Sequence, residues 1–230
     1  MAMLPARSAD YALIQLDGKY LKWGAPQFGA PGLATYGFVT RPTRFPATRN
    51  CSSMTRIEPE ALGPGITETR WSETVRSAFA AWSAIAGIQF RPARANERAN
   101  ILIGIQAEPQ GWAFTDVSPS RVPGATGSIA TRGLNPQVPP FPPSGTASSV
   151  ATLRQALICL NPRRSWKIGL DGNVRVYDLG FTLMHEIGHA IGLDHPSNGD
   201  ALMHFRYRDM PASLHQGDIL GARFLYGPPG

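Results

Sequence analysis

Histidine, lysine and cysteine are scarce in this sequence of 230 residues, and long apolar runs are absent. None of the five histidines precedes His185. No apolar run approaches the length that crosses a bilayer, so we expect no transmembrane helix. The N-terminal residues lack the apolar region of a signal peptide, so we expect no signal peptide either. Only three of the 22 basic residues are lysines. The arginines that carry the formal charge of +6 are scattered and not interleaved with aromatics, which argues against nucleic-acid binding.

Two cysteines, Cys51 and Cys159, leave two alternatives open: one disulfide, if the chain is exported, or two separate thiols. A chain of this length is large enough to form one domain with a substantial core. The 24 glycines and 21 prolines indicate much loop, most of it between the predicted helices. This distribution favours an α/β (α+β) fold over a helical bundle.

The most informative segment begins at His185 and reads His-Glu-Ile-Gly-His-Ala-Ile-Gly-Leu-Asp-His. On a helix, His185 and His189 are one turn apart and face the same way, so both imidazoles can bind one metal ion. Gly192 allows the helix to end with a positive φ, and the chain can then return His195 as a third ligand. Three neutral nitrogens leave one tetrahedral position open, which is typical of catalytic zinc. Glu186 can hold a water at that position without binding the metal itself.

The residues around this segment support a helix. Asp178 can cap its N-terminus, and Met184, Ile187 and Ile191 form an apolar stripe at helical spacing, with the histidines off the stripe and facing a cleft. Two histidines and a glutamate at this spacing also occur in helices that bind no metal. The fixed offsets of the later glycine and of His195 make that alternative weak.

The segment resembles the zinc-binding signature of the metzincin metalloproteases, and its details are similar to the matrixin (matrix-metalloprotease-like, M10) family in a bacterial-type, reduced form. Eight residues after His195, Met203 in Ala-Leu-Met resembles the matrixin Met-turn, whose methionine lies beneath the zinc without binding it. Tyr207 matches the tyrosine that lines the wall of the S1′ pocket. Residues 214–227, which end in Leu-Tyr-Gly, are similar to the family's C-terminal helix.

The resemblance implies a metzincin-type mixed twisted sheet with an antiparallel edge strand, a backing helix, an active-site helix, a Met-turn and a C-terminal helix. We expect a single catalytic domain over residues 1–230. Its parts would be an N-terminal extension at 1–19, an upper subdomain at about 20–192 and a lower subdomain at 193–230.

Periodicity places most of these elements. Helical spacing over Val75–Phe90 predicts the first helix and the turn into its next strand. Gly127–Ala130 resembles the edge strand along which matrixins bind substrate. Strands are also predicted at 12–16, at 35–40 as the first strand of the family fold, at 100–105 and at 156–160. Long loops are predicted at 41–70, 106–126 and 135–149.

The sequence departs from the family in several places. Matrixins hold a second, structural zinc with three histidines and an aspartate upstream of the active helix; no histidine precedes His185, so we expect one zinc only. Astacins and serralysins have a tyrosine two residues after the methionine that can bind zinc, but here Phe205 has no oxygen to offer. The proline after His195 is similar to serralysins. Of the family's paired aspartates in the last helix, only Asp218 remains.

The resemblance implies a zinc metalloendopeptidase that hydrolyses internal peptide bonds. Zinc held by His185, His189 and His195 would lower the pKa of its water towards about 7. Glu186 would act first as general base and then as acid towards the leaving amine. Two alternatives stay open: a catalytically inactive, zinc-stabilised binding or adhesion module, and a narrow-specificity metzincin of another family.

The same resemblance predicts how a protein or peptide substrate binds. Its backbone would pair with the edge strand at Ser128, Ile129 and Ala130, which fixes the scissile bond over the metal. Phe181 would lie near the floor of the S1′ pocket and Tyr207 in its wall, giving a shallow or medium pocket.

Calcium, a secreted location and a monomeric state are further expectations drawn from the family. For calcium, the candidate ligands are Asp116 and the turn Asp171-Gly172-Asn173, although such a sequence is usually only a turn. Secretion is inferred from the family alone.

Overall fold

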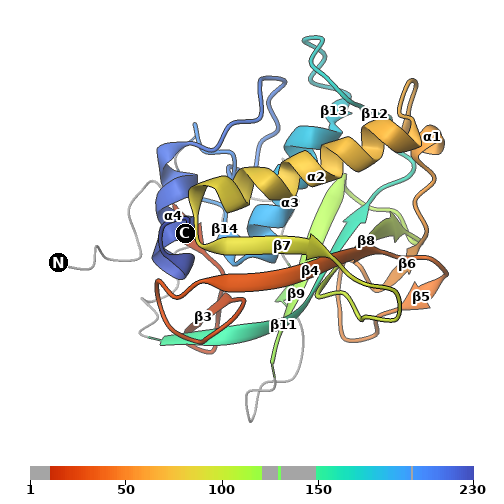
Figure 1. Cartoon of the computed structure of the whole chain (residues 1–230). Coiled ribbons are helices and arrows are strands. Elements are labelled where there is room, and N and C mark those ends of the chain that lie inside the picture. The colour runs from red at the N-terminus through yellow and green to blue at the C-terminus, as the bar shows by residue number, and fades with distance from the viewer. Residues whose placement is uncertain (1–10, 121–128, 131–148, 198) are drawn as a thin grey trace.

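The computed structural model describes residues 11–120, 129–130, 149–197 and 199–230, and its centre is a twisted mixed sheet (Figure 1). The main path of this ten-stranded sheet runs β10-β9-β11-β8-β4-β7. The last four strands of the path are parallel to one another, whereas β9 is antiparallel to β11 and β10 is antiparallel to β9. The bounds are Ile129–Ala130 (β10), Ala113–Pro119 (β9), Ser149–Leu160 (β11), Ile101–Gln106 (β8), Gly32–Phe38 (β4) and Ile88–Pro92 (β7). The predicted mixed sheet with an antiparallel edge is therefore confirmed.

Short strands extend this sheet and tie distant parts of the chain together. The hairpin of β2 and β3 joins β11 in parallel through β3, and the hairpin of β5 and β6 joins β8 through β6. Two further pairs lie outside the sheet: β1 with β14, and β12 with β13. Their bounds are Ala12–Leu13 (β1), Gln15–Leu16 (β2), Lys19–Lys22 (β3), Thr43–Arg44 (β5), Ser53–Thr55 (β6), Trp166–Lys167 (β12), Tyr177–Asp178 (β13) and Leu193–Asp194 (β14).

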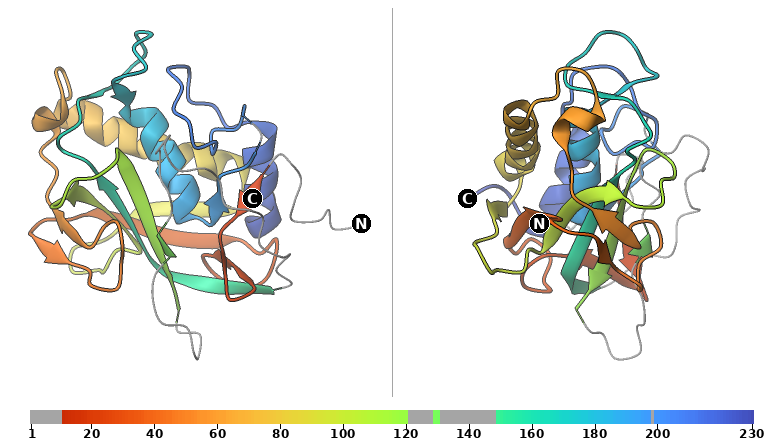
Figure 2. Two further views of the ribbon diagram at one scale, coloured as in Figure 1. Left: turned by 180° about the vertical axis from the view of Figure 1, so that it is seen from behind. Right: turned by 90° about the vertical axis from the view of Figure 1, so that its right-hand side faces the viewer.

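Two long helices, α2 (Glu68–Ile85) and α3 (Leu179–Ala190), lie side by side on one face of the sheet (Figures 1 and 2). The hydroxyl of Thr67 caps α2 by accepting the N–H of Arg70. Buried residues at 71, 75, 78, 79 and 82 recur at helical spacing and pack α2 onto the core. The indole N–H of Trp82 donates to the carbonyl of Met184 at 2.9 Å, which joins the two helices.

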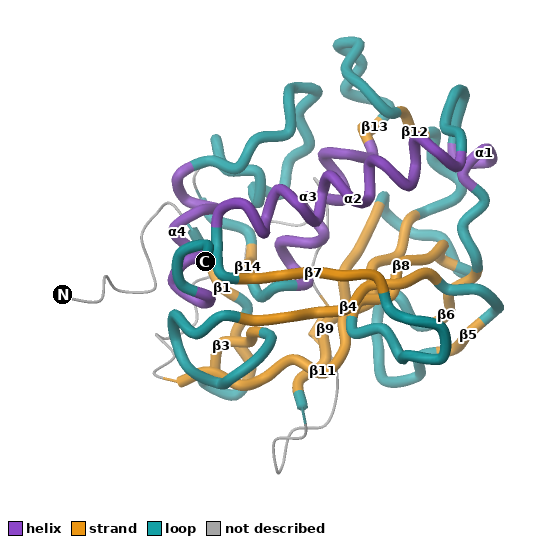
Figure 3. Tube along the Cα trace, in the orientation of Figure 1, coloured by secondary structure: helices purple, strands orange, loops and turns teal. Residues whose placement is uncertain are grey.

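The described residues also form two smaller helices, α1 (Pro59–Leu62) and the C-terminal α4 (Gln216–Tyr226). The described residues between β14 and α4, 195–197 and 199–215, form loop (Figure 3). None of the helices in the described parts of the chain combines the length and apolar character that a bilayer crossing requires.

Several sequence predictions about loops and boundaries were wrong. The loop predicted at 106–126 contains β9, and the loop predicted at 41–70 contains β5, β6, α1 and the start of α2. The strand predicted at 35–40 is β4, shifted towards the N-terminus and preceded by three short strands, and the strand predicted at 156–160 is the second half of β11. Strands of two or three residues are too short to show a period, so only their tertiary pairing defines them.

The disulfide, one of two alternatives left open by the sequence, is confirmed: Cys51 and Cys159 are bonded. It connects the loop before β6 to β11, on the side of the sheet opposite α3, where both cysteines are fully buried with Met54 and Leu157. Asp116 lies at the same place and accepts the backbone N–H of Cys51 at 2.9 Å. The disulfide thereby fastens the loop before β6 to β11, in the main sheet.

Candidate functional site

Helix α3 begins where the sequence predicted. One carboxylate oxygen of Asp178 accepts the N–H of Phe181 at 2.7 Å and caps the helix. After the helix, Gly192 has φ +104, and a Cβ there would overlap the carbonyl oxygen of Leu21, so only glycine fits. The predicted buried stripe of Met184, Ile187 and Ile191 is confirmed, but burial extends beyond it, because every residue of α3 except Gly180 is buried. That the histidines face a cleft stays a prediction.

Three histidine nitrogens converge at the C-terminal end of α3. The Nε2 atom of His195 lies 3.0 Å from Nε2 of His185 and 3.1 Å from Nε2 of His189. The first two histidines come from α3, and β14 returns His195 to them. Zn–N bonds of about 2.0–2.1 Å in a tetrahedron place the nitrogens roughly 3.3 Å apart. The spacing therefore fits one ion of this size.

The opposite ring nitrogens fix the protonation of two of these histidines. Nδ1 of His185 lies 2.9 Å from the carbonyl oxygen of Leu202, and Nδ1 of His189 lies 2.8 Å from that of Leu193. A carbonyl can only accept, so each Nδ1 carries the proton and each Nε2 is an acceptor in the neutral ring. Burial, with the nearby His189, holds the pKa of His185 well below its ordinary 6.5, and burial also lowers the pKa of His189.

Two buried acceptor atoms, Nε2 of His185 and Nε2 of His189, thus point at His195, which can offer at most one proton from its own Nε2. A cation bound between the three rings satisfies all of these nitrogens at once. On the chemistry of this donor set, the three histidines could hold a metal ion.

The Met-turn residue packs directly against α3. Met203 is 1% exposed, and a Cβ at Gly188 would overlap its sulfur, so the absence of a side chain at Gly188 lets the sulfur lie against the helix backbone. Asp218 of α4 holds the turn in place by accepting the N–H of Leu202 at 2.8 Å and that of Met203 at 3.1 Å. Because the carbonyl of Leu202 faces His185, one turn connects α4 to the histidine cluster.

Glu186 is fully buried and contacts the sheet. The Thr115 hydroxyl, in β9, lies 2.7 Å from Oε2 of Glu186 and 3.0 Å from its backbone oxygen. The carboxylate next to the first histidine is therefore held by a side chain from another element.

The two predicted pocket residues, Phe181 and Tyr207, are brought together. Their rings meet edge to face with centroids 5.1 Å apart. The other side of the Tyr207 ring stacks on Tyr177 at 4.0 Å, and Tyr177 stacks in turn on Trp112 at 3.7 Å. Phe181 and Tyr207 are both buried, so a continuous aromatic stack covers the N-terminal end of α3.

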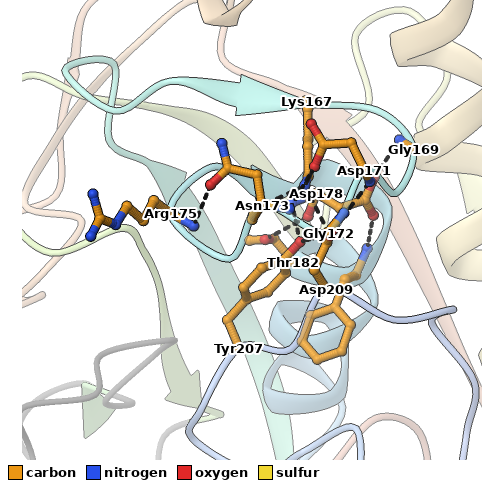
Figure 4. Close-up of polar contacts among 11 residues, drawn as sticks. Lys167, Gly169, Asp171, Gly172, Asn173, Arg175, Asp178, Thr182, Tyr207 and Asp209 are labelled. Carbon is orange, nitrogen blue, oxygen red and sulfur yellow. Dashed lines mark hydrogen bonds and ion pairs between the residues drawn. The ribbon is translucent and has the colours of Figure 1, made fainter.

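The hydroxyl of Tyr207 is fixed by a polar network that sequence reasoning did not find (Figure 4). It accepts the N–H of Asp178 at 2.9 Å and donates to Asp209 at 2.7 Å. The Asp209 side chain is only 2% exposed and forms an ion pair with Lys167 at 2.9 Å. Burial by itself raises the pKa of Asp209, but hydrogen bonds from Lys167, Tyr207 and the backbone N–H groups of Asp171 and Gly172 lower it to about 2.

The remaining predicted residues are placed only in part. Ser128 lies outside the described residues. Ile129 and Ala130 form β10 and pair with Val117 and Asp116 of β9, so backbone pairing does occur at the predicted edge.

The calcium candidates face hydrogen-bond donors. The carboxylate of Asp116 accepts the backbone N–H groups of Asn50 and Cys51, and that of Asp171 contacts the ammonium of Lys167 and the N–H of Asn173. Calcium binding therefore stays a prediction.

Sequence reasoning missed Thr115, Lys167 and Asp209. A signal for Thr115 existed: residues 113–119 read Ala-Phe-Thr-Asp-Val-Ser-Pro, with strand-forming residues among them. Lys167 and Asp209 are 42 residues apart, counted as 209 − 167, and only the fold shows that they meet.

Taken with the mixed sheet and its antiparallel edge, the histidine helix above a buried methionine turn is the arrangement of the metzincins. Within that class the chain belongs to the matrixins: residues 144–227 match the family model described as Matrixin. Matrix metalloproteinase-23 of Bos taurus is 33% identical over 163 residues, which are 68% of this chain and 37% of that protein. The Homo sapiens protein of the same name is 31% identical over 163 residues, 70% of this chain and 37% of the relative.

A shorter match has higher identity: matrix metalloproteinase-B of Caenorhabditis elegans is 44% identical over 59 residues, 24% of this chain and 11% of the relative. The matched segments therefore cover no more than 37% of the length of these three relatives. At the level of the family, the match is to metalloproteases of the hydrolase class.

Proposed function

We propose that this chain is a zinc-dependent endopeptidase that cleaves internal peptide bonds of protein substrates. The observation that carries the proposal is the convergence of three buried Nε2 atoms at 3.0 and 3.1 Å, next in sequence to a buried glutamate. His185, His189 and His195 would hold the zinc. The ion supplies Lewis acidity, which polarises a carbonyl and lowers the pKa of a water.

Glu186 is assigned the proton transfers. As general base it takes a proton from the attacking water, and as general acid it gives the proton to the amine that leaves. The imidazoles of His185 and His189 remain neutral throughout, because each keeps its one proton on Nδ1, which donates to the carbonyl of Leu202 or of Leu193. Met203 supports the site through packing alone.

We assign substrate binding to the sheet edge and the aromatic stack. An extended peptide would pair with the edge near Ser128, Ile129 and Ala130, in a cleft between the proposed subdomains 20–192 and 193–230. Phe181 and Tyr207 would bound a shallow or medium S1′ pocket, since their rings already touch. The buried disulfide supports an exported location, because disulfides persist in oxidising compartments.

The test is cleavage of casein or gelatin by the zinc-loaded chain, with and without a chelator. We expect one zinc per chain, activity that the chelator removes and zinc restores, and no activity for Glu186→Ala with its zinc retained. Glu73→Ala, the same change at an exposed site on α2, should cleave like the unaltered chain.

A peptide library in the same assay separates the alternatives. Cleavage of only a few peptides indicates a narrow-specificity enzyme. Zinc binding with no cleavage of any protein or peptide refutes the proposal and favours a binding module. Near-normal cleavage by Glu186→Ala would show that the proton transfers are wrongly assigned.

A further inference from the structure

Thr115 is the point at which the sheet contacts the buried glutamate. It lies in the middle of β9, opposite Ile158 of β11, and is fully buried. Its neighbours face the other side of the sheet: Phe114 packs around the disulfide, and Asp116 accepts the N–H of Cys51. Because side chains alternate along a strand, Thr115 faces α3.

The contact is short and chemically specific. The Thr115 hydroxyl lies 2.7 Å from Oε2 of Glu186, a normal length for a hydroxyl donating to a carboxylate. Its other acceptor, the backbone oxygen of Glu186, is farther away at 3.0 Å. A buried carboxylate is costly unless hydrogen bonds satisfy it, and Thr115 supplies one of them.

The residue types suit a positioning role. Glutamate has three rotatable side-chain bonds and loses much conformational freedom when it is fixed. Threonine is branched at Cβ and therefore stiff, and the disulfide and Asp116 fasten the strand that carries it. The hydroxyl thus holds one carboxylate oxygen from a rigid support.

We propose that Thr115 is a positioning residue that fixes the carboxylate of Glu186 for proton transfer. The inference rests on the proposed function, since it assigns a partner to the general base of that reaction. Thr115 acts through Glu186 and binds neither metal nor substrate.

The first experiment compares two variants. Thr115→Val keeps the side-chain shape and removes the hydroxyl, whereas Thr115→Ser keeps the hydroxyl. Thr182→Val is the matched control: Thr182 is equally buried, on α3 itself, and its hydroxyl donates to the carbonyl of Asp178 at 2.8 Å. We expect Thr115→Val to lose about 10- to 100-fold in kcat, as for a lost hydrogen bond to a charged group, with little change in KM. Thr115→Ser should recover most of this, and Thr182→Val should keep its kcat.

A second readout does not depend on turnover. Each full-length variant is first shown to bind one zinc, and acetohydroxamate is then titrated by calorimetry, because its hydroxyl proton needs a carboxylate acceptor beside the ion. We expect Thr115→Val to bind acetohydroxamate about tenfold more weakly and Thr182→Val to bind it normally. If Thr115→Val does not fold, Thr115→Ala and Thr115→Ser replace the pair, since they differ only in the hydroxyl.

The outcomes separate the two proposals. If the unaltered chain cleaves peptides and Thr115→Val matches it in kcat and acetohydroxamate affinity, the positioning role is wrong and the peptidase proposal stands. A serine variant as slow as the valine variant also overturns the role. If the unaltered chain cleaves nothing, yet acetohydroxamate affinity still falls in Thr115→Val alone, the peptidase proposal fails and the positioning stands.

Discussion

Asp218 is the residue through which the C-terminal helix holds the histidine cluster, and Asp218→Asn should weaken both the fold and the metal site. Its carboxylate accepts three backbone N–H groups, from Leu202 at 2.8 Å, Met203 at 3.1 Å and His215 at 2.9 Å. Asparagine keeps one acceptor oxygen and turns an NH₂ group towards the remaining N–H. At least one buried donor therefore loses its partner and meets another donor.

The size of the effect follows from these bonds. A hydrogen bond to a charged acceptor contributes about 1.5–3 kcal/mol, and relief of the buried negative charge offsets part of its loss. A net loss of roughly 2 kcal/mol lowers the Tm of a domain of this size by about 4–8 °C. Because the carbonyl of Leu202 orients His185, we also expect zinc affinity to fall about tenfold, as for other partners of metal ligands.

Calorimetric melting and zinc titration test this reasoning. Asp200→Asn is the matched control, because Asp200 lies in the same loop with a side chain 77% exposed, in an ion pair at 3.3 Å with Arg208. Exposed ion pairs contribute about 0–1 kcal/mol, so the control should melt like the unaltered chain. An Asp218→Asn variant that melts and binds zinc like this control would refute the role assigned to Asp218.

Three further changes test other parts of the structure. Burial lowers the pKa of the Lys22 ammonium from 10.5 to about 8, so the folded state binds fewer protons than the unfolded state between these two pH values, and stability rises with pH across that window. In urea unfolding, Lys22→Met should therefore stabilise the fold by about 1–3 kcal/mol at pH 7 and by less at pH 10. An unchanged unfolding midpoint at pH 7 would contradict this. Replacing Cys51 and Cys159 by alanine opens a loop of 108 residues and should cost about 2–5 kcal/mol, checked by melting with and without reductant, which should no longer affect the variant. Gly188→Ala places a Cβ onto the Met203 sulfur and should destabilise the fold by about 1–3 kcal/mol, measured as a lower Tm. An unchanged Tm would show that the turn carrying Met203 can move away at little cost in free energy.

The part of the site that lies close together in sequence was predictable. His185, His189 and His195 fall within eleven residues, so helical spacing and one glycine-assisted turn are enough to bring their nitrogens together. The cap at Asp178 and the positive φ at Gly192 were foreseen for the same reason. The mixed sheet followed from a family resemblance carried by these motifs.

Contacts between distant segments could not be predicted in this way. The strand of Thr115 looked like loop, because its residues gain stability only by pairing with β11. The pairing of Cys51 with Cys159 was left open, since a sequence holds no distance between them.

The sequence by itself therefore determined the donor set: which nitrogens can meet, and that a glutamate stands beside them, because one helix and one turn are local structures. Only the tertiary structure decided what holds those donors. The carbonyls of Leu202 and Leu193, the hydroxyl of Thr115 and the carboxylate of Asp218 come from four separate places in the chain. Their positions depend on how the sheet, α3 and α4 pack together, which no local pattern encodes.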